Sequence, residues 1–241
     1  MPVSNASLLD LACTATELAD GWTDLDAGEA VSTSEVNAPA ADPKATVWSF
    51  DTNTSADTND YAARTKDVGS VEGLGNRIVV SVKTYCDLVG TLANTDIFQL
   101  YVWRSDWQFL AQFSSDGLFI ARGPGDYPEV GTNLVVQDTW QEWTFDIDIS
   151  AGVANAVCDV YLDNVLQASG VDCSFTDTGT DGNIWFYLFG YTTDNLIAYV
   201  DWLKIGDGLV TGWIGKINGV TNPAKINGIA VANIAKVNGI A

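Results

Sequence analysis

Histidine is absent from the 241-residue sequence, and only 11 basic residues stand against 31 acidic ones. Without histidine the chain has no Ser-His or Cys-His nucleophile pair, no histidine-ligated zinc and no histidine general base. A net charge of −20 is opposite to what a phosphate-binding surface needs, and it repels anionic membranes. We therefore expect neither nucleic acid nor a membrane as a partner.

Other familiar signals are also missing. The four cysteines, Cys13, Cys86, Cys158 and Cys173, contain no CxxC motif, so a zinc site is not expected. Cys158 lies in an alternating apolar pattern that indicates a buried thiol, and we favour reduced cysteines over two disulfides. No apolar run is long enough for a transmembrane helix. The first residues lack a basic segment followed by an apolar one, so we expect no signal peptide.

Aromatic residues and glycine are plentiful, with nine Trp, eight Tyr, nine Phe and 22 Gly. This composition is typical of strands joined by tight turns. Apolar and polar residues alternate along residues 77–85, 97–103, 107–113 and 140–149. No long helical period appears between residues 46 and 206. We expect about a dozen strands, and a sheet that large folds into two packed layers.

Three stretches point to one fold family. The string W-x-x-W-T-F-D-I-D-I begins at Trp140, the hairpin V-Y-L-D-N-V-L begins at Val160, and the strand Y-V-D-W-L-K-I-G begins at Tyr199. Their order resembles the concanavalin A-like, laminin G-like jelly roll, as does the segment at residues 61–69. The resemblance covers about residues 20–206 and implies an all-β, two-sheet jelly-roll sandwich. This fold carries lectins, glycosidases, lyases and structural modules, so the resemblance does not fix a function.

The sequence divides into three parts. Residues 1–20 are an N-terminal segment that is compatible with a short helix or with an edge strand and turn. Residues 21–207 form the expected sandwich, and residues 208–241 form a repeat tail. Residues 1–207 contain all the acids and have a net charge of −23, whereas the tail has three lysines, no acid and a charge of +3. This split indicates a tail that docks onto something acidic, or simply three solvated lysines.

The repeat tail contains the motif K-[I/V]-N-G-[I/V] three times, at residues 216–220, 225–229 and 236–240. Asn-Gly breaks helices and favours tight turns, so we expect an extended, β-type tail. So thin a chain has no core of its own, and its Ile and Val side chains need copies or a partner to bury them. The residues assigned to assembly are Lys216, Ile217, Asn218, Gly219, Lys225, Ile226, Asn227, Gly228, Ile234, Lys236, Val237, Asn238, Gly239 and Ile240.

Such tandem repeats resemble the C-terminal tails of tailed-bacteriophage structural proteins. That resemblance implies a virion protein, either a capsid-decorating or head-fibre protein or a tail component. We expect a homo-oligomer, with a trimer favoured, or attachment to a neighbouring virion protein. The alternative for the tail is a frayed chain end.

Catalytic signatures of the fold family are missing. Glycosidases of this fold resemble E-x-D-x-x-E on one strand, and the nearest string here is Glu142, Asp146 and Asp148. The solvated face of an acidic strand explains these carboxylates equally well, and the resemblance implies that alginate-lyase relatives need histidine. We therefore expect a protein that is not an enzyme and has no cofactor.

Calcium is the one ion that the loops suggest. Asp163, Asp177, Asp181 and Asp194 lie in turn sequences and supply oxygen donors, and laminin G-like domains often bind calcium at a loop rim. Asp and Asn also stabilise turns by themselves. We take Asp163, Asp181 and Asp194 as the candidate ligands.

A glycan-binding face is the remaining candidate site. The aromatic residues Tyr101, Trp103, Trp185, Tyr187 and Tyr191 would form a platform for sugar stacking if their strands adjoin. The alternative is that these rings fill the space between the two sheets. The sequence thus favours a phage virion structural protein that aids glycan adhesion at a host surface, and leaves a stand-alone carbohydrate-binding, lectin-like module as the second interpretation.

Overall fold

The computed structural model describes residues 3–13, 22–24, 32–36, 47–51, 60–88, 97–190, 196–210 and four two-residue strands of the repeat tail. These residues form an all-β sandwich of two antiparallel sheets, which confirms the predicted jelly-roll class. Helical structure within the described part is limited to two 3-10 turns, η2 (Glu72–Leu74) and η3 (Val153–Asn155). None of the described helical turns is long and apolar enough to cross a membrane.

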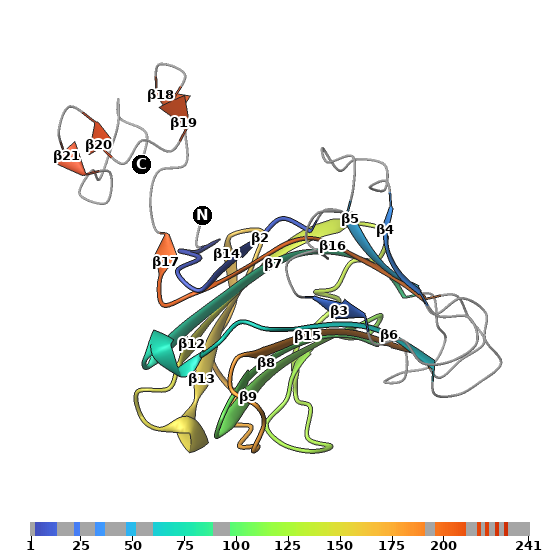
Figure 1. Ribbon diagram of the computed structural model, residues 1–241, viewed down its shortest axis with the longest axis horizontal. Coiled ribbons are helices and arrows are strands. Elements are labelled where there is room, and N and C mark those ends of the chain that lie inside the picture. The colour runs from blue at the N-terminus through green and yellow to red at the C-terminus, as the bar shows by residue number, and fades with distance from the viewer. Residues whose placement is uncertain are drawn as a thin grey trace.

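Two sheets make up the sandwich, and Figure 1 shows them as two stacked layers. In order across the sheet, the eight-stranded sheet contains β14 (Val165–Asp172), β13 (Val157–Leu162), β12 (Trp140–Asp148), β7 (Arg77–Leu88), β16 (Leu196–Gly206), β5 (Val47–Asp51) and β4 (Ser32–Val36), with β2 (Leu9–Leu11) also paired to β16. The seven-stranded sheet contains β11 (Glu129–Thr132), β10 (Gly117–Ile120), β9 (Trp107–Ser114), β8 (Ile97–Arg104), β15 (Asn183–Gly190), β6 (Asp60–Asp67) and β3 (Thr23–Asp24).

The core lies between the sheets, and the alternation seen in the sequence fills it. On β7 and β12, the inward residues Val80 and Phe145 are fully buried, as are Phe98 on β8 and Phe186 on β15. Successive side chains of a strand point to opposite faces, so the residues between them lie on the outer faces of the sheets. The predicted turn at Asp163-Asn164 has positive φ at both residues (46° and 72°), as expected for a type I′ hairpin turn.

The N-terminal residues take the strand alternative rather than the helix where they are described. β2 pairs with β16, and β1 (Val3–Ser4) pairs with β17 (Leu209–Val210). The Ser4 backbone N–H donates to Ser81 Oγ on the outer face of the eight-stranded sheet, and this hydroxyl also hydrogen-bonds Thr144 Oγ1 at 2.9 Å. The β1 and β17 pair therefore lies over the outer face of the eight-stranded sheet, and the repeat tail follows directly from β17.

Two short hairpins are described in the repeat tail. β18 (Lys216–Ile217) pairs with β19 (Val220–Thr221), and β20 (Lys225–Ile226) pairs with β21 (Ile229–Ala230). An Asn-Gly pair lies between the strands of each hairpin in the sequence. The other assembly residues, from Asn218 and Gly219 to the third repeat, lie outside the described residues.

The four cysteines are buried, and none of them forms a disulfide. Burial raises the pKa of Cys86 to about 12 and raises the pKa of Cys158 and of Cys173 as well. A thiol is nucleophilic only as thiolate, so these groups are unreactive at neutral pH.

Candidate functional site

The aromatic residues predicted as a glycan platform lie on two adjacent strands, β8 and β15. These strands pair antiparallel, with Trp185 directly opposite Tyr101. The residues that alternate with them, such as Leu100 and Phe186, are fully buried between the sheets. The rings that point the other way, onto the outer face of the seven-stranded sheet, are those of Tyr101, Trp103, Trp185 and Tyr187.

Three of these rings form a chain of contacts, and the fourth stacks on a ring of the next strand. Tyr101 and Trp103 are stacked with their centroids 5.1 Å apart, and Trp103 meets Trp185 edge to face at 5.3 Å. Tyr187 stacks on Tyr61 of β6 at 4.7 Å. Such spacings lie within the favourable range for aromatic pairs, so each ring restricts the movement of its neighbours.

Two connecting segments turn this surface into a pocket of about 500 Å³, the aromatic pocket. The segment after β10 supplies Pro124, Gly125 and Tyr127, and it is attached to β9 by the Ala121 N–H donating to Leu110 O at 3.1 Å. The segment between β14 and β15 supplies Phe175 and Asp177. The pocket size falls in the range of about 300–1,000 Å³ that is usual for small-molecule sites.

Gln108 on β9 also lines the aromatic pocket, and its side chain is almost completely buried, with an exposed fraction of 3%. Its Oε1 atom has no hydrogen-bond partner among the residues that the structure describes. A buried polar atom left in this state costs about 1–3 kcal/mol, which a ligand hydroxyl donating to it would offset.

Neighbouring polar groups of the same sheet face are satisfied, which sets Gln108 apart. The Gln99 Nε2 group donates to Gln112 Oε1 at 3.1 Å, and the Tyr101 hydroxyl donates to Gln99 Oε1 at 2.8 Å. The indole N–H groups of Trp103 and Trp185 have no partner among the described residues, but the same is true of tryptophans in the core. Gln108 is therefore the more specific sign of a ligand-binding site.

Few groups in the aromatic pocket titrate. Burial, with a smaller contribution from Tyr127, raises the pKa of Tyr101 well above its usual value, so the phenol stays protonated at neutral pH. Asp177 is the one carboxyl group that lines the described pocket, and its Oδ1 atom accepts the Thr178 N–H at 2.8 Å. The pocket is suited to holding an apolar face and hydroxyl groups rather than to moving protons.

The prediction of an aromatic platform thus locates the pocket, and the interpretation that these rings fill the core is wrong for the four described ones. Tyr191, the fifth predicted residue, lies outside the described residues. Three of the pocket residues were not predicted from the sequence: Gln108, Tyr127 and Phe175. The alternation along residues 107–113 already placed Gln108 on the outer face, but no sequence signal predicted that two loops would close over that face.

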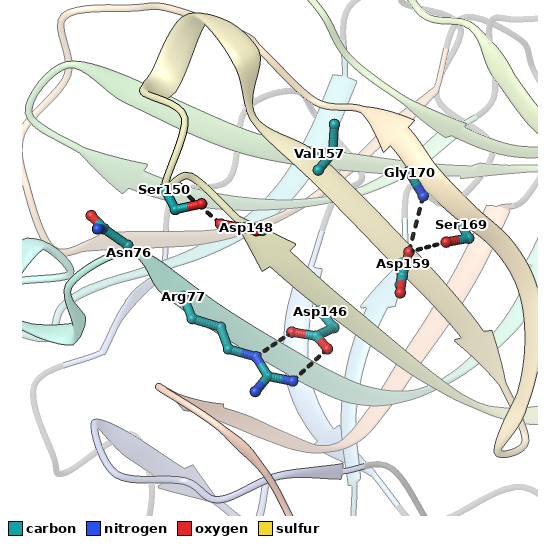
Figure 2. Close-up of a pocket in the computed structure, with 9 residues that line it drawn as sticks. All are labelled: Asn76, Arg77, Asp146, Asp148, Ser150, Val157, Asp159, Ser169 and Gly170. Carbon is teal, nitrogen blue, oxygen red and sulfur yellow. Dashed lines mark hydrogen bonds and ion pairs between the residues drawn. The ribbon is translucent and has the colours of Figure 1, made fainter.

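A second hollow, of about 620 Å³, lies on the outer face of the eight-stranded sheet. Figure 2 shows that each of its three aspartates, Asp146, Asp148 and Asp159, has a partner among the neighbouring residues. The Arg77 guanidinium donates to both carboxylate oxygens of Asp146, at 2.8 and 2.7 Å. Asp159 Oδ1 accepts bonds from the Ser169 hydroxyl and the Gly170 N–H, at 2.6 and 2.9 Å. This hollow offers a ligand few unsatisfied groups.

The carboxylate string of β12 belongs to this same outer face. Asp146 pairs with Arg77, and Asp148 accepts the Ser150 N–H, which lowers the pKa of Asp148. Burial is the main cause that raises the pKa of Glu142. None of the three lines the aromatic pocket.

The candidate calcium ligands have structural partners. Asp181 accepts bonds from the Ser70 hydroxyl and the Val71 N–H, at 2.6 and 3.0 Å. Asp163, in its hairpin turn, accepts the Glu142 N–H of the neighbouring strand β12 at 3.0 Å. Asp194 lies outside the described residues. No group of three or more potential metal-ligating side chains occurs among the residues searched, which are the described ones.

Comparison with known proteins shows the fold. No family model matches the chain, and no curated protein matches its sequence. Among solved structures, an endo-beta-1,4-glucuronan lyase from the fungus Trichoderma reesei superimposes with a TM-score of 0.53 at 12% identity, over 78% of this chain and 91% of the lyase. A carbohydrate esterase from the Shiga toxin-encoding bacteriophage phi24B gives 0.54 at 10% identity, over 82% and 96%.

A third similar structure is the binding domain of botulinum neurotoxin DC in complex with SialylT, with a TM-score of 0.50 at 12% identity. This likeness covers 86% of this chain but only 49% of the toxin domain. At such low identities the three likenesses establish a shared jelly-roll fold.

Proposed function

We propose that this chain is a glycan-binding adhesion protein of a bacteriophage virion, held in the particle by its repeat tail. The observation that carries the glycan-binding part is the aromatic pocket, which is lined by four aromatic rings of β8 and β15 and by Gln108, whose buried Oε1 atom has no partner among the described residues. A pyranose ring presents an apolar C–H face and a rim of hydroxyl groups. Aromatic walls with a few fixed polar groups complement both features.

Binding without turnover is part of the proposal. Glycoside hydrolysis uses two carboxyl groups on either side of the scissile bond. The aromatic pocket presents only Asp177 among its described lining residues, and Glu142, Asp146 and Asp148 lie on the other sheet. Incubation with the glycan that binds should release no new reducing or unsaturated ends.

The position of the tail supports the attachment part. The repeat tail follows β17, which lies with β1 over the outer face of the eight-stranded sheet, whereas the aromatic pocket is on the outer face of the seven-stranded sheet. A chain held by its tail would therefore present the pocket away from its attachment. The phage phi24B esterase has the same fold, so this fold is compatible with a phage protein.

The pocket is tested by substitution of Trp185. A glycan array with the full chain identifies a ligand, and titration calorimetry then compares variants. We expect Trp185→Ala to weaken binding about 30-fold, because a buried aromatic contact contributes about 2 kcal/mol. Trp185→Phe keeps a ring and should weaken binding by less than about fivefold.

The matched control is Trp140→Ala, which removes a half-buried tryptophan from the outer face of the other sheet. It should leave affinity unchanged. Absence of any glycan ligand, or equal loss with both alanine variants, would refute the proposed site.

The tail is tested by truncation. Because Val210 belongs to β17, the cut is best placed after Val210, so that the pairing with β1 is retained. We expect light scattering to give a trimer for the full chain and a monomer for the truncated one. Only the full chain should co-purify with phage particles. An unchanged mass state together with intact glycan binding would instead support a stand-alone lectin-like module.

A further inference from the structure

The aromatic pocket is nearly free of charged side chains. Of its described lining residues only Asp177 is ionisable at neutral pH, and it is acidic. No lysine or arginine lines the described pocket. Arg122 is a basic residue in the segment after β10, which covers the pocket. Its guanidinium donates to Asp126 at 2.9 Å, so its charge already has a partner.

An acidic ligand would find no counter-charge in this pocket. A carboxylate or sulfate that leaves water needs a cation or several N–H donors in return. Here it would approach Asp177 inside a chain whose net charge is −20. Like charges brought together disfavour such a complex, so the pocket selects against uronic acids, sialic acids and sulfated sugars.

A neutral sugar matches the groups that are present. Gln108 lines the pocket, and its Oε1 atom, which has no partner among the described residues, can accept a hydroxyl proton. The stacked rings contact the apolar face of a pyranose without needing any charge. We propose that the aromatic pocket binds a chain of uncharged hexose units. This inference rests on the proposed glycan-binding function and deepens it.

Matched oligosaccharides test the proposal, because the two members of each pair differ only in the group on C6. The pairs are cellohexaose with the glucuronate hexamer of the same linkage, and mannohexaose with the corresponding mannuronate hexamer. Titration calorimetry with the full chain should show that the neutral member of at least one pair binds at least about tenfold more tightly than its acidic partner.

The outcomes are distinguishable. Equal or tighter binding of an acidic member overturns the neutral selectivity but leaves the glycan-binding function in place. Binding of a cationic glucosamine hexamer in preference to both pairs also overturns it, and would make Asp177 the selective group. If none of these oligosaccharides binds and a wider glycan array is also negative, the proposed function itself fails.

Two variants probe the physical cause. Gln108→Met keeps a similar volume and removes the acceptor, so the neutral hexamer should bind about five- to tenfold more weakly while the melting temperature does not fall. Asp177→Lys puts a cation on the pocket wall and should raise the affinity for the acidic hexamer about tenfold. If Asp177→Lys brings no gain for the acidic member, charge does not set the selectivity and the proposal is wrong.

Discussion

The two outer faces of the sandwich differ in how their buried polar side chains are paired. On the eight-stranded sheet, Arg77 pairs with Asp146, Lys83 pairs with Asp201, and β1 covers Ser81. On the seven-stranded sheet, the aromatic pocket leaves Gln108 Oε1 buried without a partner among the described residues. Both faces are built from the same alternating strands, so strand pattern alone does not explain the difference.

What differs is the segment that lies over each face. The β1 and β17 pair brings hydrogen-bonding groups onto the eight-stranded sheet and covers part of it. The loops over the seven-stranded sheet attach through Leu110 and Phe175 at the side of the pocket, and they leave the rings of β8 and β15 accessible. Under our proposal, one face contributes to stability and attachment, and the other binds the ligand.

The largest effect that would sharpen this comparison is expected from Asp201→Asn. Lys83 Nζ lies 3.0 Å from Asp201 Oδ2, and the side chains are only 12% and 4% exposed. Removal of the carboxylate charge leaves a mostly buried ammonium without this ion-pair partner. We expect the free energy of unfolding to fall by about 2 kcal/mol in urea denaturation, with glycan affinity unchanged.

Asp10→Asn is the matched control. Asp10 pairs at 3.3 Å with Lys204, which lies on β16 like Asp201, but the Asp10 side chain is 64% exposed. An exposed pair contributes little, so the loss should stay below about 0.5 kcal/mol. If Asp201→Asn weakened glycan binding as strongly as it weakens the fold, the two faces would not be independent.

Much of the sandwich was predictable because one physical rule governs it. Strands with one buried face alternate, and residues 97–103 and 140–149 show this alternation clearly. Turn chemistry fixed the hairpin at Asp163-Asn164, where positive φ favours Asn and Asp. The short strands β1 and β2 were ambiguous because they bind through backbone hydrogen bonds to β17 and β16, and no side-chain period marks them.

The pocket was predictable only in part. An aromatic alternation on β15 revealed which rings share a face, but it did not reveal whether that face is inside or outside. That choice depends on which face of each sheet meets the other sheet, a long-range property. The contributions of Tyr127 and Phe175 depend on loops folding back over β9, and loop paths of this length leave no periodic signal.

Gly179→Ala should alter the aromatic pocket with little change in the stability of the fold. Gly179 packs so closely on Trp103 that an added Cβ would collide with the indole ring. The ring must shift away from its stacked position on Tyr101, which disturbs the wall of the pocket. We expect titration calorimetry to show about tenfold weaker glycan binding. The urea midpoint should change little.

Gly73→Ala is the control for this change, since a Cβ at Gly73 meets no atom within 4 Å. It should alter neither affinity nor stability. If Gly179→Ala binds glycan as well as the unchanged chain, the position of the Trp103 ring does not matter and the pocket is less organised than its ring contacts indicate.

The smallest effect is expected at Glu142, on the outer face that we regard as structural. Burial is the main cause that raises its carboxyl pKa, with further contributions from Asp163 and Asp201. A pKa raised in the folded state means that the charged carboxylate is less favourable there than in the unfolded chain. The carboxylate therefore destabilises the fold at neutral pH, and this penalty disappears below the unfolded-state pKa.

Glu142→Gln removes that charge, so we expect a gain in the free energy of unfolding of roughly 0.5 kcal/mol or less near neutral pH. The gain should fade as the pH falls through the raised folded-state pKa and should be absent below about 4, where the wild-type carboxyl is protonated in both states. Urea titrations of both proteins across this pH range measure it. Glu142 also begins the carboxylate string that comes nearest to a glycosidase signature. If the wild-type chain cleaves a glycan and Glu142→Gln abolishes that cleavage, the chemistry lies on this face, and the division into a structural face and a binding face fails.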